Sequence, residues 1–176
     1  MGLALGLVLA IAGPVRAKEV VPWGAGCIPT PPGTVRTSSN CGAELVEGRA
    51  IAPVGAPGAV KSAIAAANRI DNRPYVWGGG HLAWDARGYD CSGAVGYALH
   101  GADLLDRTMV SGQLVSWGEP GAGRWITVYA NVDHVYMVIA GLRFDTRSDP
   151  LGVNGPRWHR ASVDPRKFVA RHPAGL

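Results

Sequence analysis

The chemistry of this sequence centres on a cysteine, a histidine and a carboxylate: Cys91, His134 and Asp145. A cysteine thiolate attacks carbonyl groups, a histidine takes and returns the proton, and a carboxylate can fix the orientation of the imidazole. Taken alone, Cys91 fits better as a buried structural cysteine, because free cysteine is among the most buried residue types. The three residues together favour a catalytic interpretation.

The residues around Cys91 predict a helix that begins at or near the cysteine. Asp90 is a favoured N-cap residue, apolar residues recur at helical spacing from Ala94 to Leu99, and Gly101 is a natural helix stop. A thiol in the first turn lies beside unpaired backbone N–H groups and the positive end of the helix dipole. We therefore expect its pKa to be lowered.

Three segments rich in β-branched and aromatic residues predict strands at 125–129, 134–140 and 142–146. Gly141 marks a very short turn between the last two. The start of one antiparallel strand lies beside the end of the next, so Asp145 is expected to approach His134. Asp133 is the alternative carboxylate, but neighbouring strand residues point to opposite faces, which favours Asp145.

Three segments resemble the NlpC/P60 cysteine peptidases, the papain-like cell-wall endopeptidases. They are Pro74-Tyr-Val-Trp-Gly-Gly79, Tyr89-Asp-Cys-Ser-Gly93, and His134-Val135 leading into a strand. The similarity extends from about residue 60 to residue 146, roughly half of the chain. It implies an α+β fold of the papain-like NlpC/P60 type, in which the helix bearing the catalytic cysteine packs on an antiparallel β-sheet.

The resemblance also implies roles for single residues. Cys91 would be the nucleophile and His134 the base, and Asp145 falls where the family has its third polar residue. The Tyr75 hydroxyl would lie near the cysteine and help to polarise the scissile carbonyl, while Asp90 resembles a position that contacts a substrate amino group in some members. The expected oxyanion- and substrate-binding residues are Tyr75, Asp90, Ser92, His81 and Trp77. His81 fits a solvated loop histidine as well, and Trp77 fits a buried core tryptophan.

The expected function is that of a secreted cysteine hydrolase. It would cleave an amide bond in peptidoglycan stem peptides through a Cys-His-Asp triad and an acyl-enzyme, and the family's habitual bond joins D-glutamate to a diamino acid. Where the family usually has His-Val-Gly, this sequence has His134-Val135-Tyr136. This difference leaves the expected hydrolysis unchanged and concerns which substrate is cleaved. The alternatives are a non-catalytic cell-wall-binding protein that kept the fold, and a thiol amidase or acyltransferase acting on another substrate.

The N-terminus indicates export. Residues 3–12 are an apolar run, Gly13-Pro14 breaks it, and Val15-Arg16-Ala17 resembles a cleavage site, so we predict a signal peptide over residues 1–17, with an uncleaved anchor as the alternative. The predicted location is secreted or at the cell surface of a bacterium. In an oxidising compartment Cys27 and Cys41 would pair in a disulfide and leave Cys91 free.

The remaining sequence suggests an irregular Gly/Pro-rich arm over residues 18–57 and a catalytic domain with an irregular C-terminal tail over residues 58–176. The net charge of +4 favours anionic surroundings such as cell-wall polymers. No basic stripe indicates nucleic acid, and no Cys-x-x-Cys or His-x-x-x-His spacing indicates zinc. We therefore expect no metal, no cofactor and no nucleic-acid partner. The expected form is a monomer that acts on a peptidoglycan peptide and has no stable membrane insertion after signal cleavage.

Overall fold

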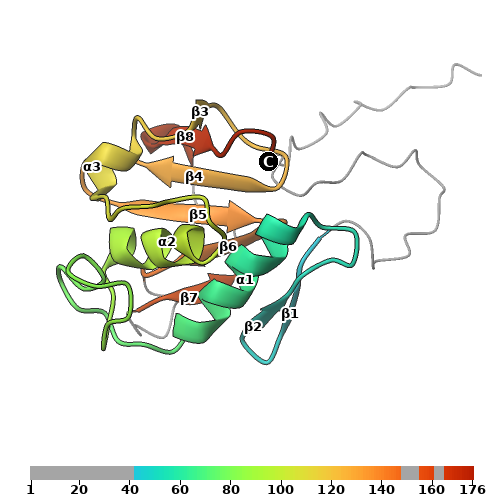
Figure 1. Cartoon of the computed structure of the whole chain (residues 1–176), viewed down its shortest axis with the longest axis horizontal. Helices are drawn as coiled ribbons and strands as arrows, with labels where there is room; N and C mark the ends of the chain where they lie inside the picture. The colour runs from blue at the N-terminus through green and yellow to red at the C-terminus, as the bar shows by residue number, and fades with distance from the viewer. Residues whose placement is uncertain (1–41, 148–154, 161–164) are drawn as a thin grey trace, which may run out of the picture.

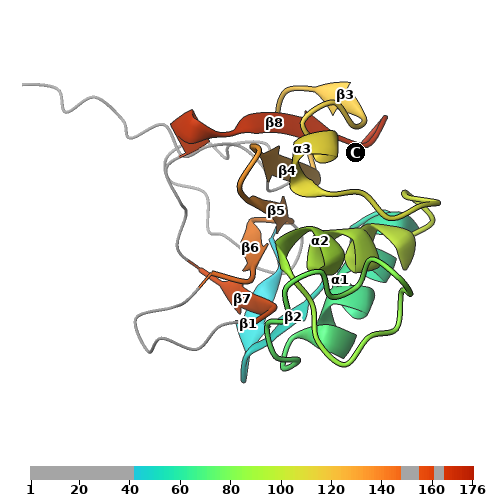
Figure 2. The same ribbon diagram turned by 90° about the vertical axis from the view of Figure 1, so that its left-hand side faces the viewer.

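The computed structural model describes residues 42–147, 155–160 and 165–176. In them, two helices pack together on one face of a six-stranded antiparallel sheet (Figures 1 and 2). The helices are α1 (Gly58–Ile70) and α2 (Cys91–His100), with a short α3 (Ser111–Leu114) and a 3₁₀ turn η1 (Pro165–Lys167). The sheet has the order β3 (Glu119–Pro120), β8 (Val169–His172), β4 (Ile126–Ala130), β5 (Val135–Ile139), β6 (Leu142–Asp145) and β7 (Arg157–His159). The α+β class with the cysteine helix on an antiparallel sheet is confirmed.

The contact between α1 and α2 depends on small residues. Alanine and glycine occupy the facing positions, and a β-carbon at Gly101 would lie only 2.4 Å from that of Ala66. The apolar sides of both helices are buried, as are nearly all residues of β4, β5 and β6. The core between the helices and the sheet therefore holds α2 against β5 and β6, the two strands that carry the other candidate groups.

The hairpin of β5 and β6 agrees with its prediction. The two strands are joined by Ala140 and Gly141 alone, whose φ angles of 46° and 86° are those of a type I′ turn. Met137 pairs with Phe144, and both are fully buried in the core. Because side chains alternate along a strand, Asp145 points to the opposite face from Phe144.

Two expectations about irregular segments are wrong within the described residues. The predicted arm contains a hairpin, β1 (Glu44–Val46) and β2 (Arg49–Ile51), that turns at Glu47 and Gly48 with φ angles of 50° and 83°. The tail supplies β7 and β8, which pair with β6 and with β3 and β4. These strands are three or four residues long and are stabilised by distant partners, so their local patterns carry little signal.

Trp158 of β7 anchors the end of the chain on the domain. Its ring lies 4.9 Å from that of Phe144, and its indole N–H donates a 2.8 Å hydrogen bond to Oδ1 of Asn68 in α1. The same amide of Asn68 also exchanges two hydrogen bonds with the backbone of Ala50 in β2. One side chain of α1 therefore joins the first hairpin to the sheet.

Two predictions lie outside the described residues: the signal peptide over residues 1–17 and the disulfide between Cys27 and Cys41. Within the described part of the chain, no helix has the length and apolar character needed to cross a membrane. Cys91 is a free, partly exposed thiol.

Candidate active site

Cys91 is the first residue of α2, as its sequence context predicts. Its backbone N–H is one of the first-turn donors that no helix carbonyl accepts. Asp90 caps the helix in an extended conformation, and its Oδ1 accepts a 2.7 Å hydrogen bond from the N–H of Gly93. The thiol is therefore placed at the positive end of a helix dipole, where a negative charge is favoured.

His134 and Asp145 meet as the hairpin geometry predicts. Nε2 of His134 lies 2.9 Å from Oδ1 of Asp145, and their side chains are only 6% and 1% exposed. The same carboxylate accepts a 2.9 Å hydrogen bond from the backbone N–H of Arg147, and its Oδ2 lies 3.4 Å from Nε of Arg143. A carboxylate with these partners is held in one orientation and stays charged.

The electrostatics of the pair follow from burial and these contacts. Burial alone would lower the pKa of His134, but its hydrogen bonds with Asp145 and Cys91 and the charge of Asp145 raise that pKa above the ordinary value of 6.5. Burial alone would raise the pKa of Asp145, but the bonds from His134 and the Arg147 backbone lower it below 3.8. Since Nε2 of His134 is engaged by Asp145, Nδ1 is the nitrogen left to face the thiol.

Tyr75 lies beside the cysteine. Burial, and then the negative charges of Cys91 and Asp90, raise the pKa of the Tyr75 hydroxyl, so the hydroxyl keeps its proton at neutral pH. An isolated parallel bridge between Tyr75 and Tyr89 fixes the backbone there, with the N–H of Val76 bonded to the carbonyl of Tyr89 at 3.2 Å. A protonated hydroxyl close to the nucleophile can donate to an oxyanion.

Asp90 joins the cysteine helix to the loop before it. Besides the cap bond within α2, its Oδ2 accepts from the N–H of Gly78 at 3.1 Å. Its Oδ1 lies 3.1 Å both from Nε2 of His81 and from Oγ of Ser92, which are also 3.1 Å apart. The structure thus brings His81 and Ser92 together around Asp90 and half-buries His81. Trp77 is 88% exposed, so the core alternative for it is wrong.

The glycine run fits against the start of α2 without room for side chains. A β-carbon at Gly93 would lie 2.0 Å from the carbonyl oxygen of Gly79, and one at Gly79 would lie 2.3 Å from that of Gly88. Gly80 has a φ angle of 85°, in the region that favours glycine, and packs against the Tyr89 ring. Close backbone approach explains this run.

Some supporting residues were not singled out from the sequence. Oδ1 of Asn131 accepts from the backbone N–H groups of Asp133 and His134, at 2.9 and 2.8 Å, and so shapes the turn that presents the histidine. The ring of Phe168 packs edge-on against that of His134, with centroids 6.3 Å apart. The asparagine three residues before a predicted strand is a usable turn signal. The aromatic character of Phe168 predicts only that it docks on the domain and does not point to His134 as its partner.

Comparisons with known proteins identify the fold. No family model matches the sequence, and no curated protein matches it either. Among solved structures, the peptidoglycan hydrolase RipB of Mycobacterium tuberculosis is 27% identical with a TM-score of 0.51, and the match covers 69% of this chain and 68% of that one. RipD of the same organism, a non-catalytic NlpC/p60 domain protein adapted to peptidoglycan binding, is 18% identical with a TM-score of 0.50 over 66% and 98% of the two chains. A hypothetical invasion protein of that organism is 21% identical with a TM-score of 0.47 over 64% and 61%.

The chain is structurally similar to NlpC/P60 domain proteins, which confirms the predicted resemblance at the level of the family. This fold is consistent with peptidoglycan hydrolysis and with peptidoglycan binding. The roles of the individual site residues rest on the geometry described above.

Proposed function

We propose that this protein is a cysteine hydrolase of the cell wall that cleaves an amide bond in peptidoglycan stem peptides. The observation that carries the proposal is the position of His134, which bonds Asp145 through Nε2 and lies close enough to Cys91, at the start of α2, for the cysteine to raise the pKa of the imidazole. A nucleophile, a base and an orienting carboxylate are then present in one continuous arrangement.

The first half of the reaction forms an acyl-enzyme. His134 takes the thiol proton of Cys91, and its raised pKa favours holding that proton as imidazolium. The Sγ thiolate attacks the scissile carbonyl carbon, and the carbonyl oxygen becomes an oxyanion. The backbone N–H of Cys91, free at the start of α2, and the protonated hydroxyl of Tyr75 would donate hydrogen bonds to that oxyanion.

The second half releases the products. The tetrahedral intermediate collapses, the carbon–nitrogen bond breaks, and His134 gives its proton to the leaving amine. A water molecule then loses a proton to His134 and attacks the thioester. The carbon–sulfur bond breaks, the carboxylic product leaves, and the proton returns to the thiol of Cys91. Asp145 stays ionised throughout and holds the imidazole in one tautomer.

The substrate proposal is supported by the fold and the charge of the chain. RipB, a peptidoglycan hydrolase, shares the fold at 27% identity. The net charge of +4 suits an anionic wall. By the habit of the family, the bond is the one between D-glutamate and the diamino acid. We further propose that the protein acts after export, as a secreted or surface protein.

Digestion of purified peptidoglycan tests the proposal. The protein and its Cys91→Ser variant are incubated with the wall, and released fragments are identified by mass spectrometry. We expect peptide fragments with one new carboxyl and one new amine end from the protein, and none from Cys91→Ser, which changes a single atom. Equal fragment release by both would mean that Cys91 is not the nucleophile. Wall binding without any fragments would replace hydrolysis by the binding function described for RipD.

A thiol-directed probe gives an independent check. An alkylating reagent should label Cys91 in the folded protein faster than it labels a small free thiol at the same pH, because the partly exposed thiol lies at the start of a helix and near a histidine that can accept its proton. Peptide mapping separates this label from labels on other cysteines. A thiol that reacts only after unfolding would contradict an activated nucleophile.

A further inference from the structure

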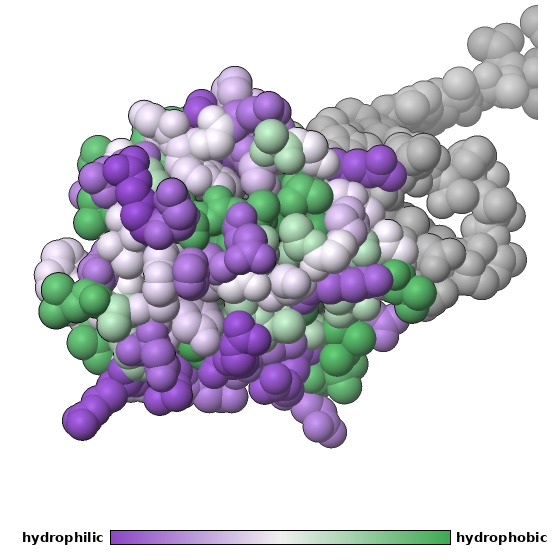
Figure 3. All heavy atoms as spheres, viewed as in Figure 1, coloured by the Kyte–Doolittle hydropathy of each residue, from purple (hydrophilic) through white to green (hydrophobic). Residues whose placement is uncertain are grey.

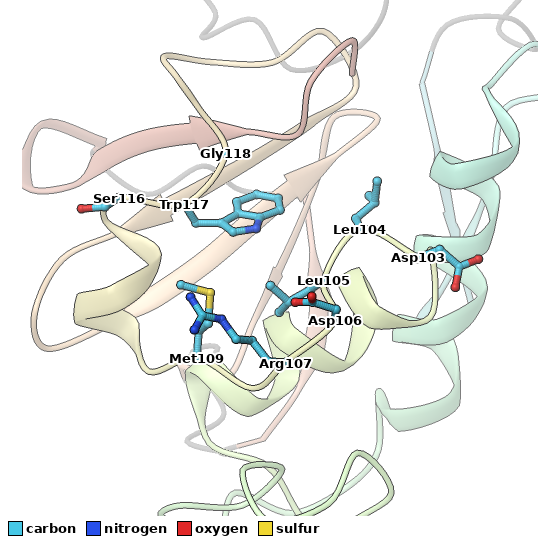
Figure 4. A pocket seen from close by; sticks show the side chains of 9 residues that line it. All are labelled: Asp103, Leu104, Leu105, Asp106, Arg107, Met109, Ser116, Trp117 and Gly118. Atoms are coloured by element: carbon cyan, nitrogen blue, oxygen red, sulfur yellow. The ribbon is translucent and has the colours of Figure 1, made fainter.

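A pocket of about 580 Å³ lies apart from the candidate catalytic groups. It opens between the segment that follows α2 and the segment that precedes β3, and none of its lining residues belongs to the expected site (Figure 4). It is lined by Asp103, Leu104, Leu105, Asp106, Arg107, Met109, Ser116, Trp117 and Gly118. Its volume is in the range of small-molecule sites, roughly 300–1,000 Å³.

The lining combines a flat aromatic surface with two charged groups. The Trp117 indole lies above the side chains of Met109 and Leu105, and the Arg107 side chain lies beside Met109, whereas Ser116 and Asp103 point away (Figure 4). Trp117 is partly buried and packs against the hydrophobic core. The face of the molecule that carries the pocket shows hydrophobic atoms among hydrophilic ones (Figure 3).

The charged groups of the pocket are available to a ligand. Among the described residues, neither Asp106 nor Arg107 has a hydrogen-bond or ion-pair partner, and both are exposed. One supplies acceptor oxygens and the other a planar set of donors. A neutral ligand with an apolar face and hydroxyl and amide groups at its edge would use all three features.

The loop that bears Trp117 is held in place from β8. The guanidinium of Arg171 donates to the carbonyl oxygens of Trp117 and Gly118, each at 2.6 Å, and to that of Ser116 at 3.3 Å. His172 adds a 3.3 Å contact with Glu119. Three successive carbonyls bound by one side chain make this wall of the pocket rigid, which lowers the entropic cost of binding.

The chain segment that forms the other wall of the pocket is hydrogen-bonded to two loops that carry candidate site residues. Thr108, next to Arg107, donates a 3.2 Å hydrogen bond to the carbonyl of His81, which contacts Asp90. Ser111, soon after Met109, donates a 3.0 Å bond to the carbonyl of Val132, near His134. The segment that lines the pocket is therefore tied to the loop of His81 and to the turn before His134.

We propose that this pocket binds an N-acetylhexosamine unit of the peptidoglycan glycan strand. The carbon–hydrogen face of the sugar would stack on the Trp117 indole, its hydroxyls would donate to Asp106, and Arg107 would donate to the acetamido oxygen. The assignment rests on the proposed function for the identity of the polymer, but not on hydrolysis itself. Stem peptides lack a flat apolar face of this size, which favours the sugar.

The experiment uses the full chain with Cys91→Ser, so that cleavage cannot interfere, and a peptide-free tetramer of N-acetylglucosamine as the probe. Binding to each variant is measured by isothermal titration calorimetry, and the Trp117 indole N–H signal in NMR titrations locates the site in the protein that retains Trp117. We expect Trp117→Phe to weaken binding and Trp117→Ala to abolish it. Asp106→Asn should weaken it about tenfold, the loss of one charge-assisted hydrogen bond. Glu44→Gln, an exposed carboxylate change on β1, should leave binding unaltered.

Unchanged binding in Trp117→Ala and Asp106→Asn, or no binding of the tetramer at all, overturns the sugar site. Shifts of the same Trp117 signal by a peptidoglycan stem peptide, with none by the tetramer, would make the pocket a peptide site and also overturn the proposal. Neither result touches hydrolysis, which is read from wall digestion by the unsubstituted protein. Loss of hydrolysis with intact tetramer binding would instead refute the proposed function alone.

Discussion

Asp145→Ala removes the carboxylate that orients His134, and Asp145→Asn removes only its charge. The side chain is 1% exposed and accepts hydrogen bonds from His134 and from the backbone of Arg147, both at 2.9 Å. Arg143 lies 3.4 Å from the second carboxylate oxygen. An alanine leaves these buried donors without an acceptor, whereas an asparagine still offers one oxygen of nearly the same shape.

The magnitudes follow from these contacts. Breaking a buried charge pair from one side costs about 3–5 kcal/mol of stability, so Asp145→Ala should unfold at a clearly lower temperature. Turnover by that variant should fall about 10²–10⁴-fold, the range that a positioned general acid and base contributes. Asp145→Asn keeps the geometry but replaces a charge-assisted hydrogen bond to His134 by a neutral one. We expect this to weaken transition-state stabilisation by about 1–2 kcal/mol, which lowers turnover roughly tenfold. KM should change little in both, because Asp145 is buried behind the histidine.

The assay measures kcat and KM on a soluble stem-peptide fragment, below the melting temperature of each variant. Asp133→Ala is the matched control, since this carboxylate is exposed and sits directly before His134. We expect it to retain near-normal turnover. If Asp133→Ala is crippled while Asp145→Ala keeps its turnover, then the orienting role belongs to Asp133 and the reasoning from the hairpin is refuted.

Other predictions concern stability and covalent state. Gly93→Ala should cost about 1–3 kcal/mol and lose activity, because its β-carbon meets a backbone oxygen at 2.0 Å. Gly96→Ala is the control in the same helix, because the new β-carbon would lie 3.5 Å from its nearest neighbour, and this change should stabilise the fold by about 0.5–1 kcal/mol. Similar unfolding free energies for the two variants would contradict the packing argument. The raised pKa of His134 adds stability that is full below its ordinary pKa of 6.5 and is lost as pH rises through the raised value. Denaturant unfolding between about pH 5 and 9 should therefore show a decline that His134→Gln flattens, and an unchanged decline would exclude this histidine as its source. Mass mapping of the exported protein should find Cys27 joined to Cys41, and a disulfide to Cys91 instead would refute both that pairing and a free nucleophile.

The central part of the fold could be predicted because its signals are local. The cap Asp90, the cysteine helix and the turn at Gly141 each depend on neighbours a few residues away. Once the hairpin is known, the approach of Asp145 to His134 follows from antiparallel pairing. Arg143 is two residues before Asp145 on the same strand, so the alternation of side chains places both on one face. The contact between Arg143 and the carboxylate of Asp145 could therefore also be predicted from the sequence.

Other features depend on parts of the chain that meet only in the folded molecule. The strands β1, β2 and β7 are only three residues long, and each is stabilised by a partner strand that the local sequence pattern does not reveal. The contact of His81 with Asp90 depends on how the glycine run folds over the helix start. The hold of Arg171 on the Trp117 loop joins two segments far apart in the sequence. None of these three features produces a periodic pattern of apolar residues in its own stretch of sequence.

The place of β8 in the sheet has a consequence for biosynthesis. Among the described residues it is the last strand in sequence order, yet it lies between β3 and β4 and supplies the hydrogen-bonding partner for that side of β4 (Figure 1). All of the candidate catalytic groups are synthesised before it. Until residues 169–172 leave the ribosome, β4 has an open edge, and open edges pair readily with other chains. A nascent chain, or one shortened before β8, would thus contain every candidate catalytic group and still be prone to aggregate, so productive folding has to wait for β8.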